Sequence, residues 1–420
     1  MKFGAHVKVI TRDGICMLGN TENGCIIGID DDARALCERL CNEDIDSSEL
    51  NEMDPFLRGR LEARDFFKQE TTRQRLESLY IHVTSHCNLS CQGCYSFEES
   101  RNRQRDLSLQ EFAVAIGNLA SLNPKRVIVS GGEPFLRKDL PSILGMIRNA
   151  LPGSYIVVLT NGTVHSSEQI EKVSRYADCI SVSIDSPSAA SASFLRQNGV
   201  FDEAMQMISI AKKTGVSVNI LPTLHAKNIH EVERFSALAD ALGCSIRFSL
   251  LACDFCESEY ASFALEAKDQ EILALKAFEI GGISFAEGLR AGHGLRARGI
   301  CGLGRTTLSM AANGNIYPCH MLHRDEYVLC NVMDGPIAER IETSLESVGL
   351  AELSVSNIEK CSKCDLAFLC GGGCRARAFQ VSGDVCACDP YCVLHHGYQD
   401  LCLKQIRKMI GERLVRNDAV

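Results

Sequence analysis

The hydrophobic pattern between residues 79 and 285 alternates apolar runs with amphipathic stretches. Six apolar runs predict buried strands at residues 79–84, 126–130, 155–160, 179–184, 216–221 and 245–250. Apolar residues at helical spacing predict five intervening helices at residues 108–121, 140–150, 166–176, 201–214 and 229–242. Strands and helices that alternate in this order favour a parallel α/β sheet, either open or closed into a barrel.

The first part of the chain predicts a smaller α+β unit. Short apolar runs predict three strands at residues 7–10, 15–18 and 25–29, followed by helices at residues 30–40, 47–52 and 55–67. The dipeptides Asp13-Gly14 and Asn23-Gly24 favour tight hairpin turns between the strands. Asp30 is a candidate N-cap for the first helix. The polar stretch 69–78 is typical of a linker to the larger sheet.

Polar and glycine-rich segments follow four of the predicted parallel strands. A cysteine loop follows the first strand, and the next three strands end at Gly131, Gly132, Glu133 and Pro134, at Asn161, and at Ser183 and Asp185. In parallel α/β folds the carboxyl ends of the strands carry the chemistry. We therefore expect these residues to meet at one mouth of the sheet, where the glycines allow the backbone to approach a ligand closely.

Composition narrows the class of protein. A chain of 420 residues is too long for one compact core, so two or three domains are expected. The net charge of −9 disfavours nonspecific nucleic-acid binding, and no apolar stretch reaches membrane-spanning length. The first residues do not form a signal peptide, which predicts a cytoplasmic protein. The 22 cysteines are then better explained by metal or iron–sulfur ligation than by a secreted disulfide scaffold.

Cys87, Cys91 and Cys94 stand at C-x3-C-x2-C spacing. Three thiolates on one loop can hold three irons of a [4Fe–4S] cluster and leave the fourth iron without a protein ligand. A structural zinc site, the alternative, favours four ligands in paired C-x2-C knuckles, and Cys87 has no such partner. The spacing therefore favours a cluster whose open iron binds a substrate or cofactor.

The loop, with Asn88 and Leu89 inside it and Tyr95 after it, resembles the motif of the radical S-adenosylmethionine (SAM) enzymes. The resemblance implies that SAM binds the open iron through its methionine nitrogen and carboxylate, and that one electron cleaves it to a 5′-deoxyadenosyl radical. The segment 131–134 resembles the family's glycine-rich motif, which holds the methionine amine. Further SAM contacts implied by the resemblance are Tyr95, Asn161, Ser183, Asp185 and Arg196, although strand-end capping also explains Ser183 and Asp185. Gly93 departs from the family, which usually carries an aromatic residue there.

Beyond residue 304 the chain is cysteine-dense and short of long periodic elements, as a metal-stapled domain should be. Cys361, Cys364, Cys370, Cys374 and Cys392, preceded by Cys301 and Cys319, resemble the SPASM domain, which carries auxiliary iron–sulfur clusters; zinc knuckles are the alternative. The resemblance implies one ligand set of Cys361, Cys364, Cys370 and Cys392, and another of Cys301, Cys319 and Cys374. Thr307 stands where some relatives have a further cysteine. The second set therefore either has an open iron, which could bind a substrate thiolate, or takes Cys386 or Cys388 as its fourth ligand.

The N-terminal unit resembles the winged-helix peptide-recognition element of peptide maturases. The resemblance implies that a precursor's leader adds a strand to the small sheet. Between residues 30 and 54 ten acids stand against Arg34 and Arg39, which favours a basic leader. A solvated acidic face on a stability module or dimer contact is the alternative.

Together these features predict an α/β fold: a partial (β/α)6 radical SAM barrel, an N-terminal winged-helix-like α+β domain and a C-terminal Cys-rich SPASM domain. The expected domain limits are residues 1–75, 76–285 and 286–420.

The resemblance implies an oxidoreductase that modifies a ribosomally synthesised precursor peptide containing cysteine. The favoured product is an intramolecular thioether, ahead of a carbon–carbon cross-link. A flavodoxin or ferredoxin-type electron donor is implied, and no nucleic-acid or membrane partner is expected. The alternatives are a sulfatase-maturase-like enzyme that modifies a protein, and a noncatalytic zinc or iron–sulfur electron-transfer protein.

Overall fold

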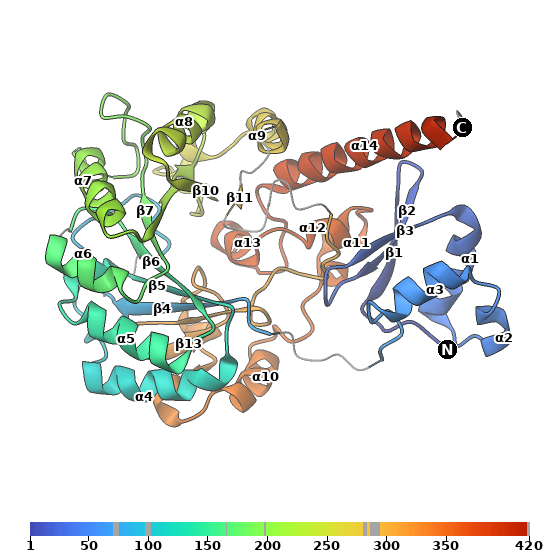
Figure 1. Ribbon diagram of the computed structural model, residues 1–420, viewed down its shortest axis with the longest axis horizontal. Coiled ribbons are helices and arrows are strands. Elements are labelled where there is room, and N and C mark those ends of the chain that lie inside the picture. The colour runs from blue at the N-terminus through green and yellow to red at the C-terminus, as the bar shows by residue number, and fades with distance from the viewer. Residues whose placement is uncertain are drawn as a thin grey trace.

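The computed structural model describes residues 1–69, 75–96, 102–164, 166–196, 199–279, 284–285 and 295–417. A large parallel sheet covered by helices lies at one end of the molecule, and a small N-terminal sheet lies at the other (Figure 1). The short helices at residues 359–382 of the cysteine-rich C-terminal region lie between the two, and the long C-terminal helix extends from there over the small sheet. Among the described residues, no helix is both long and apolar enough to cross a membrane.

The N-terminal region is a three-stranded antiparallel sheet packed against short helices. Its elements are β1 (Val7–Arg12), β2 (Ile15–Asn20), β3 (Ile26–Ile29), α1 (Asp31–Asn42), α2 (Ser47–Leu50) and α3 (Pro55–Glu62). Asp13 and Gly14 both have positive φ, as the tight turn between β1 and β2 requires. The Asp30 carboxylate caps α1 by accepting the N–H of Ala33. Because β2 lies between the other two strands, β3 lies at an edge of this sheet.

The central sheet confirms the six predicted parallel strands. They are β4 (Ser78–Thr84), β5 (Arg126–Gly131), β6 (Tyr155–Thr160), β7 (Cys179–Ser183), β8 (Ser217–Leu221) and β10 (Ser245–Leu250). Neighbours in this series are parallel, and the short strands β9 (Thr223–Leu224) and β11 (Ser284–Phe285) also pair with β10. Val129 lies opposite Ile81 on one side and Val158 on the other, and all three are fully buried. The carboxyl ends of the strands therefore lie at one edge.

Helices cover the outer face of this sheet (Figure 1). They are α4 (Leu109–Leu119), α5 (Leu140–Ala150), α6 (Ser167–Ser174), α7 (Val200–Lys213) and α8 (Val232–Leu242), with α9 (Ala267–Glu279) after β10. In α4, Ser108 and Glu111 form a capping box, and the buried Phe112, Ile116 and Leu119 recur at helical spacing. The same spacing made these helices predictable from the sequence.

The C-terminal region adds strands to the central sheet. Strand β12 (Thr307–Met310) pairs in parallel with β4, and β13 (Asn315–Tyr317) and β14 (Cys330–Asn331) follow in antiparallel order. The first strand of the barrel therefore lies inside the sheet. The sequence did not indicate these additions, because strands of two to four residues are too short to show a periodic pattern.

The remaining helices are α10 (Ala338–Ser347), α11 (Glu359–Ser362), α12 (Ala367–Cys370), α13 (Arg375–Ser382) and α14 (Cys392–Asn417). The prediction that this region lacks long periodic elements was wrong, because α14 has 26 residues. It packs along both α9 and α12, so its buried positions do not form one stripe.

The N-terminal sheet packs against the cysteine-rich region. Ile10 and Met17 form a buried cluster with Leu366, Leu369 and Leu403, which we name the docking cluster. Two predicted domain limits fall beside residues 70–74 and 286–294, which lie outside the described part, so the three-domain division remains a proposal.

Charged residues form further contacts beside the docking cluster, and we name these contacts the charged rim. The Arg12 guanidinium donates to Asp365 at 2.6 Å and lies 3.3 Å from Asp400. The Lys8 ammonium lies 5.5 Å from the centre of the Phe368 ring. Apolar and polar contacts thus hold β1 against the segment that carries Cys361, Cys364 and Cys370.

Candidate active site

The cysteine loop begins where β4 ends, at the carboxyl edge of the parallel sheet. The Asp106 carboxylate fixes its start by accepting the N–H of Ser85 at 2.8 Å and the hydroxyl of Thr84. The N–H of Cys87 donates to the Asn102 side chain at 2.8 Å. Sequence reasoning missed Asp106 and Asn102, because neither belongs to a motif.

Gly131 and Gly132 bring the loop after β5 against the start of the cysteine loop. A Cβ on Gly131 would lie 2.2 Å from the Thr84 carbonyl oxygen, and one on Gly132 would lie 2.0 Å from that of His86. The N–H groups of Gly132 and Glu133 donate to the same two oxygens at 2.8 Å. The glycines are therefore required for contact between the two loops, in addition to any approach to a ligand.

Glu133 is fully buried and joins the ends of β5 and β6. Its carboxylate accepts hydrogen bonds from the Thr160 hydroxyl at 2.8 Å and from the N–H groups of Asn161 and Phe135 at 2.7 and 3.0 Å. Burial raises the pKa of Glu133 to about 6, against the opposing effect of these hydrogen bonds. These contacts therefore fix the position of the Asn161 backbone at the carboxyl edge of the sheet.

Replacing Glu133 by glutamine should destabilise this junction. The new amide N–H2 must face at least one donor, which leaves a buried N–H without an acceptor at a cost of about 1–3 kcal/mol. We expect a melting temperature lower by about 2–8 °C in anaerobic thermal denaturation. Glu168→Gln on exposed α6 is the control, and equal melting of E133Q and wild type would contradict this role.

Arg196 and Asp185 form a buried ion pair beside Cys91. The Arg196 Nε lies 3.4 Å from Asp185 Oδ2, and the charge of the guanidinium acts on the nearby Cys91 thiol. Burial raises the pKa of Asp185, and the charge of Arg196 opposes that rise. Both carboxylate oxygens of Asp185, and Nε and Nη1 of Arg196, are buried without a hydrogen-bond partner among the described residues. A polar ligand in the cavity would satisfy such atoms.

The structure explains why Gly93 replaces the aromatic residue usual in the family. Its φ is +64°, and a Cβ there would lie 2.9 Å from the Leu251 side chain and 3.7 Å from the Cys253 sulfur. Leu251 therefore occupies the space that a larger residue at position 93 would need. Of the C-x2-C pair after β10, Cys253 is buried and Cys256 is exposed.

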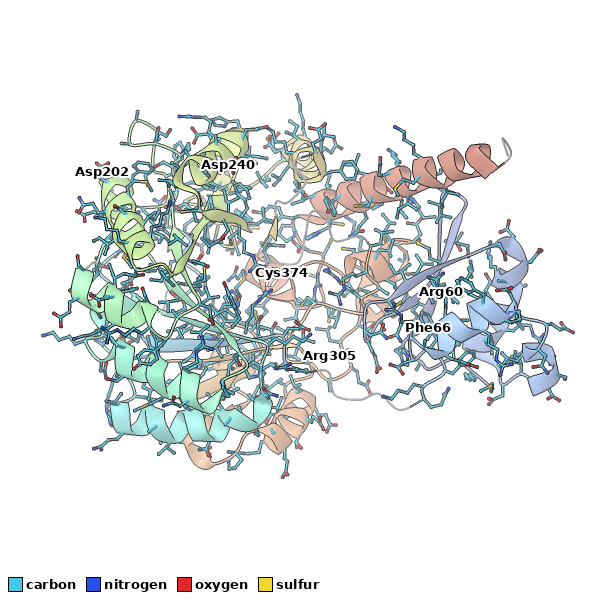
Figure 2. The ribbon with its side chains drawn as sticks, in the orientation of Figure 1. Arg60, Phe66, Asp202, Asp240, Arg305 and Cys374 are labelled. Atoms are coloured by element: carbon cyan, nitrogen blue, oxygen red, sulfur yellow. The ribbon has the colours of Figure 1, made fainter. Side chains whose placement is uncertain are left out.

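One cavity of about 1480 Å³ brings the predicted residues together. Its walls include the three loop cysteines and Tyr95, together with Gly131, Gly132, Glu133, Asn161, Ser183, Asp185, Arg196, Cys301, Cys319 and Cys374. Pro134 is buried at the start of the short helix η2 (Pro134–Leu136). His6, Lys8 and Thr21 of the N-terminal region also line the cavity. Figure 2 places Cys374 and Arg305 between the barrel and that region.

Cys301, Cys319 and Cys374 share this cavity, and we name them the inner group. Thr307 lines the cavity beside them, and its N–H donates to the Gly302 carbonyl at 2.8 Å. Its hydroxyl would lie 2.9 Å from a Cβ on Gly302. A hydroxyl thus lies next to Cys301, where some relatives carry a thiol.

Cys361, Cys364, Cys370 and Cys392 form a second set, which we name the outer group. The pKa of Cys370 is raised to about 12, first by burial and further by nearby acidic groups that include Cys361 and Cys392. Cys388 interacts electrostatically with Cys392 and Cys361, so it adjoins the outer group.

An aromatic stack joins the inner group to the cysteine loop. The His320 ring lies 3.8 Å from that of Tyr80 in a stacked arrangement and 5.2 Å from that of Tyr95. Its Nδ1 lies 3.7 Å from the Cys319 sulfur. Burial lowers the pKa of His320 to about 3, so the ring is neutral. The Tyr95 hydroxyl in turn lies 2.9 Å from that of Ser130, at the end of β5.

These residues fit an iron–sulfur cluster and SAM. All 22 cysteines lie in the described part of the chain and none forms a disulfide, and thiolate is the ligand that iron–sulfur clusters take. The cavity is large enough for a ligand of cofactor size, and Asp185 and Arg196 line it.

Comparison with protein families gives the class of protein. Residues 81–239 match the model of the Radical SAM superfamily. The chain is 24% identical over 365 residues to Fe-coproporphyrin III synthase of Methanosarcina barkeri, covering 74% of this chain and 86% of that protein. It is 26% identical over 325 residues to mycofactocin maturase MftC of Mycolicibacterium smegmatis, covering 74% and 81%. It is 23% identical over 356 residues to PqqA peptide cyclase of Streptomyces rochei, covering 78% and 93%.

Solved structures show the same fold. The structure of anSMEcpe with bound AdoMet and the Kp18Cys peptide matches with a TM-score of 0.64 and 18% identity, covering 80% of this chain and 99% of that one. Streptococcus suis SuiB bound to the precursor peptide SuiA matches with a TM-score of 0.58 and 14% identity, covering 92% and 98%.

The comparisons therefore indicate an enzyme of the radical SAM type. Residues 81–239 form a radical SAM domain, and the chain is similar to peptide maturases of that superfamily. The resemblance predicted from the cysteine loop is confirmed, and the reading as a noncatalytic metal protein is not supported. The Cys-rich C-terminal region is compatible with a SPASM domain.

Proposed function

We propose that this enzyme oxidatively modifies a ribosomally synthesised precursor peptide. The observation that carries the proposal is the cavity, which runs from the cysteine loop past the inner group to His6, Lys8 and Thr21 of the N-terminal sheet. A path of this length suits an extended chain better than a compact metabolite. SuiB, whose structure was solved with the precursor peptide SuiA bound, shares this fold over 92% of this chain, which supports the same proposal.

Cys87, Cys91 and Cys94 would hold the SAM-binding [4Fe–4S] cluster, and the inner and outer groups would hold two auxiliary clusters. When bound, the cluster and SAM supply the 5′-deoxyadenosyl radical that removes a hydrogen atom from the substrate. Asp185 and Arg196 would orient SAM through their buried, unpartnered atoms. The segment 131–134 would bind the methionine end of SAM. The hydrogen bonds of the Glu133 carboxylate would hold this segment in position.

The proposed product is an intramolecular thioether. The inner group offers three cysteines, with the hydroxyl of Thr307 beside Cys301. An iron without a fourth protein thiolate accepts a soft ligand, and a cysteine of the peptide is the natural one. A carbon–carbon cross-link is the second candidate, and a thiol of Cys386 at this iron would favour it.

The precursor's leader would add a strand at the edge formed by β3. The acidic helices next to this sheet favour a basic leader, although Arg39 already neutralises part of their charge through Glu43 and Glu49. A flavodoxin or ferredoxin-type protein would supply the electron.

Mass spectrometry tests the peptide proposal. Reconstituted enzyme, SAM and a reductant are incubated anaerobically with a cysteine-containing precursor from a neighbouring reading frame, with and without its leader. The expected result is the loss of two hydrogens from the full precursor and slower turnover of the leaderless core. An unchanged precursor, with turnover of a sulfatase peptide, would overturn the proposal.

Asp185→Asn should weaken SAM binding about tenfold, because it removes a charge from the buried ion pair that faces the cavity. Equilibrium dialysis under anaerobic conditions measures the affinity, and iron content shows that the cluster is retained. The control is Asp178→Asn, because Asp178 lies before the first residue of β7, at the end opposite to Asp185. An unchanged affinity for SAM would remove Asp185 from the binding site.

A further inference from the structure

Asp389 lies in the segment between α13 and α14, between the inner and outer groups of cysteines. Its side chain is 2% exposed, and no motif of the sequence pointed to it. A buried carboxylate is costly unless charges and hydrogen bonds compensate it, so its contacts indicate its role.

The Asp389 side chain holds the backbone of Cys374, a member of the inner group. The N–H of Cys374 donates to Asp389 Oδ2. A Cβ on the preceding Gly373 would lie 2.3 Å from the same oxygen, so only glycine admits this approach. Gly373 also has a φ of +73°, which turns the chain directly before Cys374.

The Asp389 main chain holds the backbone of Cys392, a member of the outer group. Its carbonyl accepts the N–H of Cys392 at 3.0 Å and lies 3.5 Å from the Cys388 sulfur. One residue therefore touches a cysteine of each group, through its side chain for the inner group and through its backbone for the outer group.

Arg377 forms an ion pair with the Asp389 carboxylate and fixes its orientation. Its Nε and Nη2 donate to the two carboxylate oxygens at 3.0 and 2.8 Å, and its guanidinium lies 4.6 Å from the centre of the Tyr391 ring. The N–H of Tyr391 donates to Asp389 at 2.9 Å, and the His395 ring lies 3.5 Å away. Arg377 is fully buried, so this arrangement is bidentate and shielded from solvent.

We propose that Asp389 is the positioning residue that sets the two cysteine groups relative to one another. The proposal rests on the proposed function to the extent that both groups bind iron–sulfur clusters. Asp389 does not bind iron itself. Its carboxylate, held by Arg377, fixes where Cys374 lies, and its carbonyl fixes where Cys392 lies, so the two clusters form as one unit.

Iron content and electron paramagnetic resonance of anaerobically reconstituted protein test this role without any peptide. Wild type should hold about twelve irons in three clusters. Asp389→Asn, which keeps the shape and loses the charge, should lose about four to eight of them while its SAM-cluster signal still responds to SAM. Glu359→Gln is the control, because this carboxylate lies in the same cysteine-rich region but is 92% exposed and pairs with Lys363.

A double variant separates positioning from mere folding. Asp389→Leu with Arg377→Met replaces the ion pair by apolar side chains of similar size, a change that buried pairs often tolerate. We expect its barrel to stay folded, shown by a SAM-cluster signal that still responds to SAM, while it loads auxiliary iron as poorly as D389N. Full iron loading with unchanged auxiliary signals in either variant would overturn the proposal. Wild-type protein with only about four irons would instead refute the auxiliary clusters themselves.

Discussion

Replacing Cys87, Cys91 and Cys94 together by alanine is expected to abolish SAM cleavage. The three thiols share one wall of the cavity and have no substitute ligands on their loop. Without their cluster no electron reaches SAM, so the rate of 5′-deoxyadenosine formation should fall at least about 1000-fold, to the detection limit. Chromatography of anaerobic reactions with excess reductant measures this rate, and iron content should fall by about four.

Cys256→Ala is the matched control for the triple variant. Cys256 lies in the loop after β10, near the same mouth, but it is exposed. Its replacement should leave both 5′-deoxyadenosine formation and iron content unchanged. Residual SAM cleavage by the triple variant at more than about 1% of the wild-type rate would show that another cysteine set performs the reaction.

Removing residues 1–69 is expected to destabilise the rest of the protein. The truncation exposes Leu366, Leu369 and Leu403 of the docking cluster, which are at most 2% exposed in the full chain. Exposing three leucines costs about 5 kcal/mol, enough to unfold a marginally stable region. We expect a melting temperature lower by about 10 °C or more, with loss of iron from the outer group, measured by thermal denaturation and iron analysis.

Arg12→Ala distinguishes apolar docking from the charged rim. Arg12 and Asp365 are both partly exposed, so their ion pair contributes about 1 kcal/mol or less. This variant should melt within about 3 °C of wild type. A truncated protein that kept both its melting temperature and its iron would show that the docking cluster adds no stability. Because of this packing, truncation cannot serve as a clean test of leader binding.

The sequence predicted the parts of the molecule that depend on local pattern. The six parallel strands follow from apolar runs such as residues 126–130, and the helices follow from positions such as Phe112 and Ile116. The cysteine loop has a spacing that few other sites share. Parallel strands place their carboxyl ends at one edge, and this rule was enough to predict that Asp185 lies near the cysteine loop, where both line the same cavity.

The remaining features depend on contacts between distant segments, which leave no local signal. Asp106 and Asp389 each look like an ordinary polar residue until the backbone groups that they hold are in place. The pairing of β12 with β4 and the packing of α14 on two helices are equally invisible to a periodic pattern. The contact of Gly131 with the backbone of Thr84 was not predictable for the same reason.

The pairing of β12 with β4 also bears on how the chain is made. On the ribosome, β4 emerges more than two hundred residues before its partner, so that side of the sheet stays unpaired for on the order of ten seconds or longer at ordinary elongation rates. An exposed strand edge of this kind recruits other chains. Slow translation, or oxidative damage to the C-terminal half of the chain, should therefore cause nascent chains to aggregate. Co-expression of chaperones should reduce this aggregation.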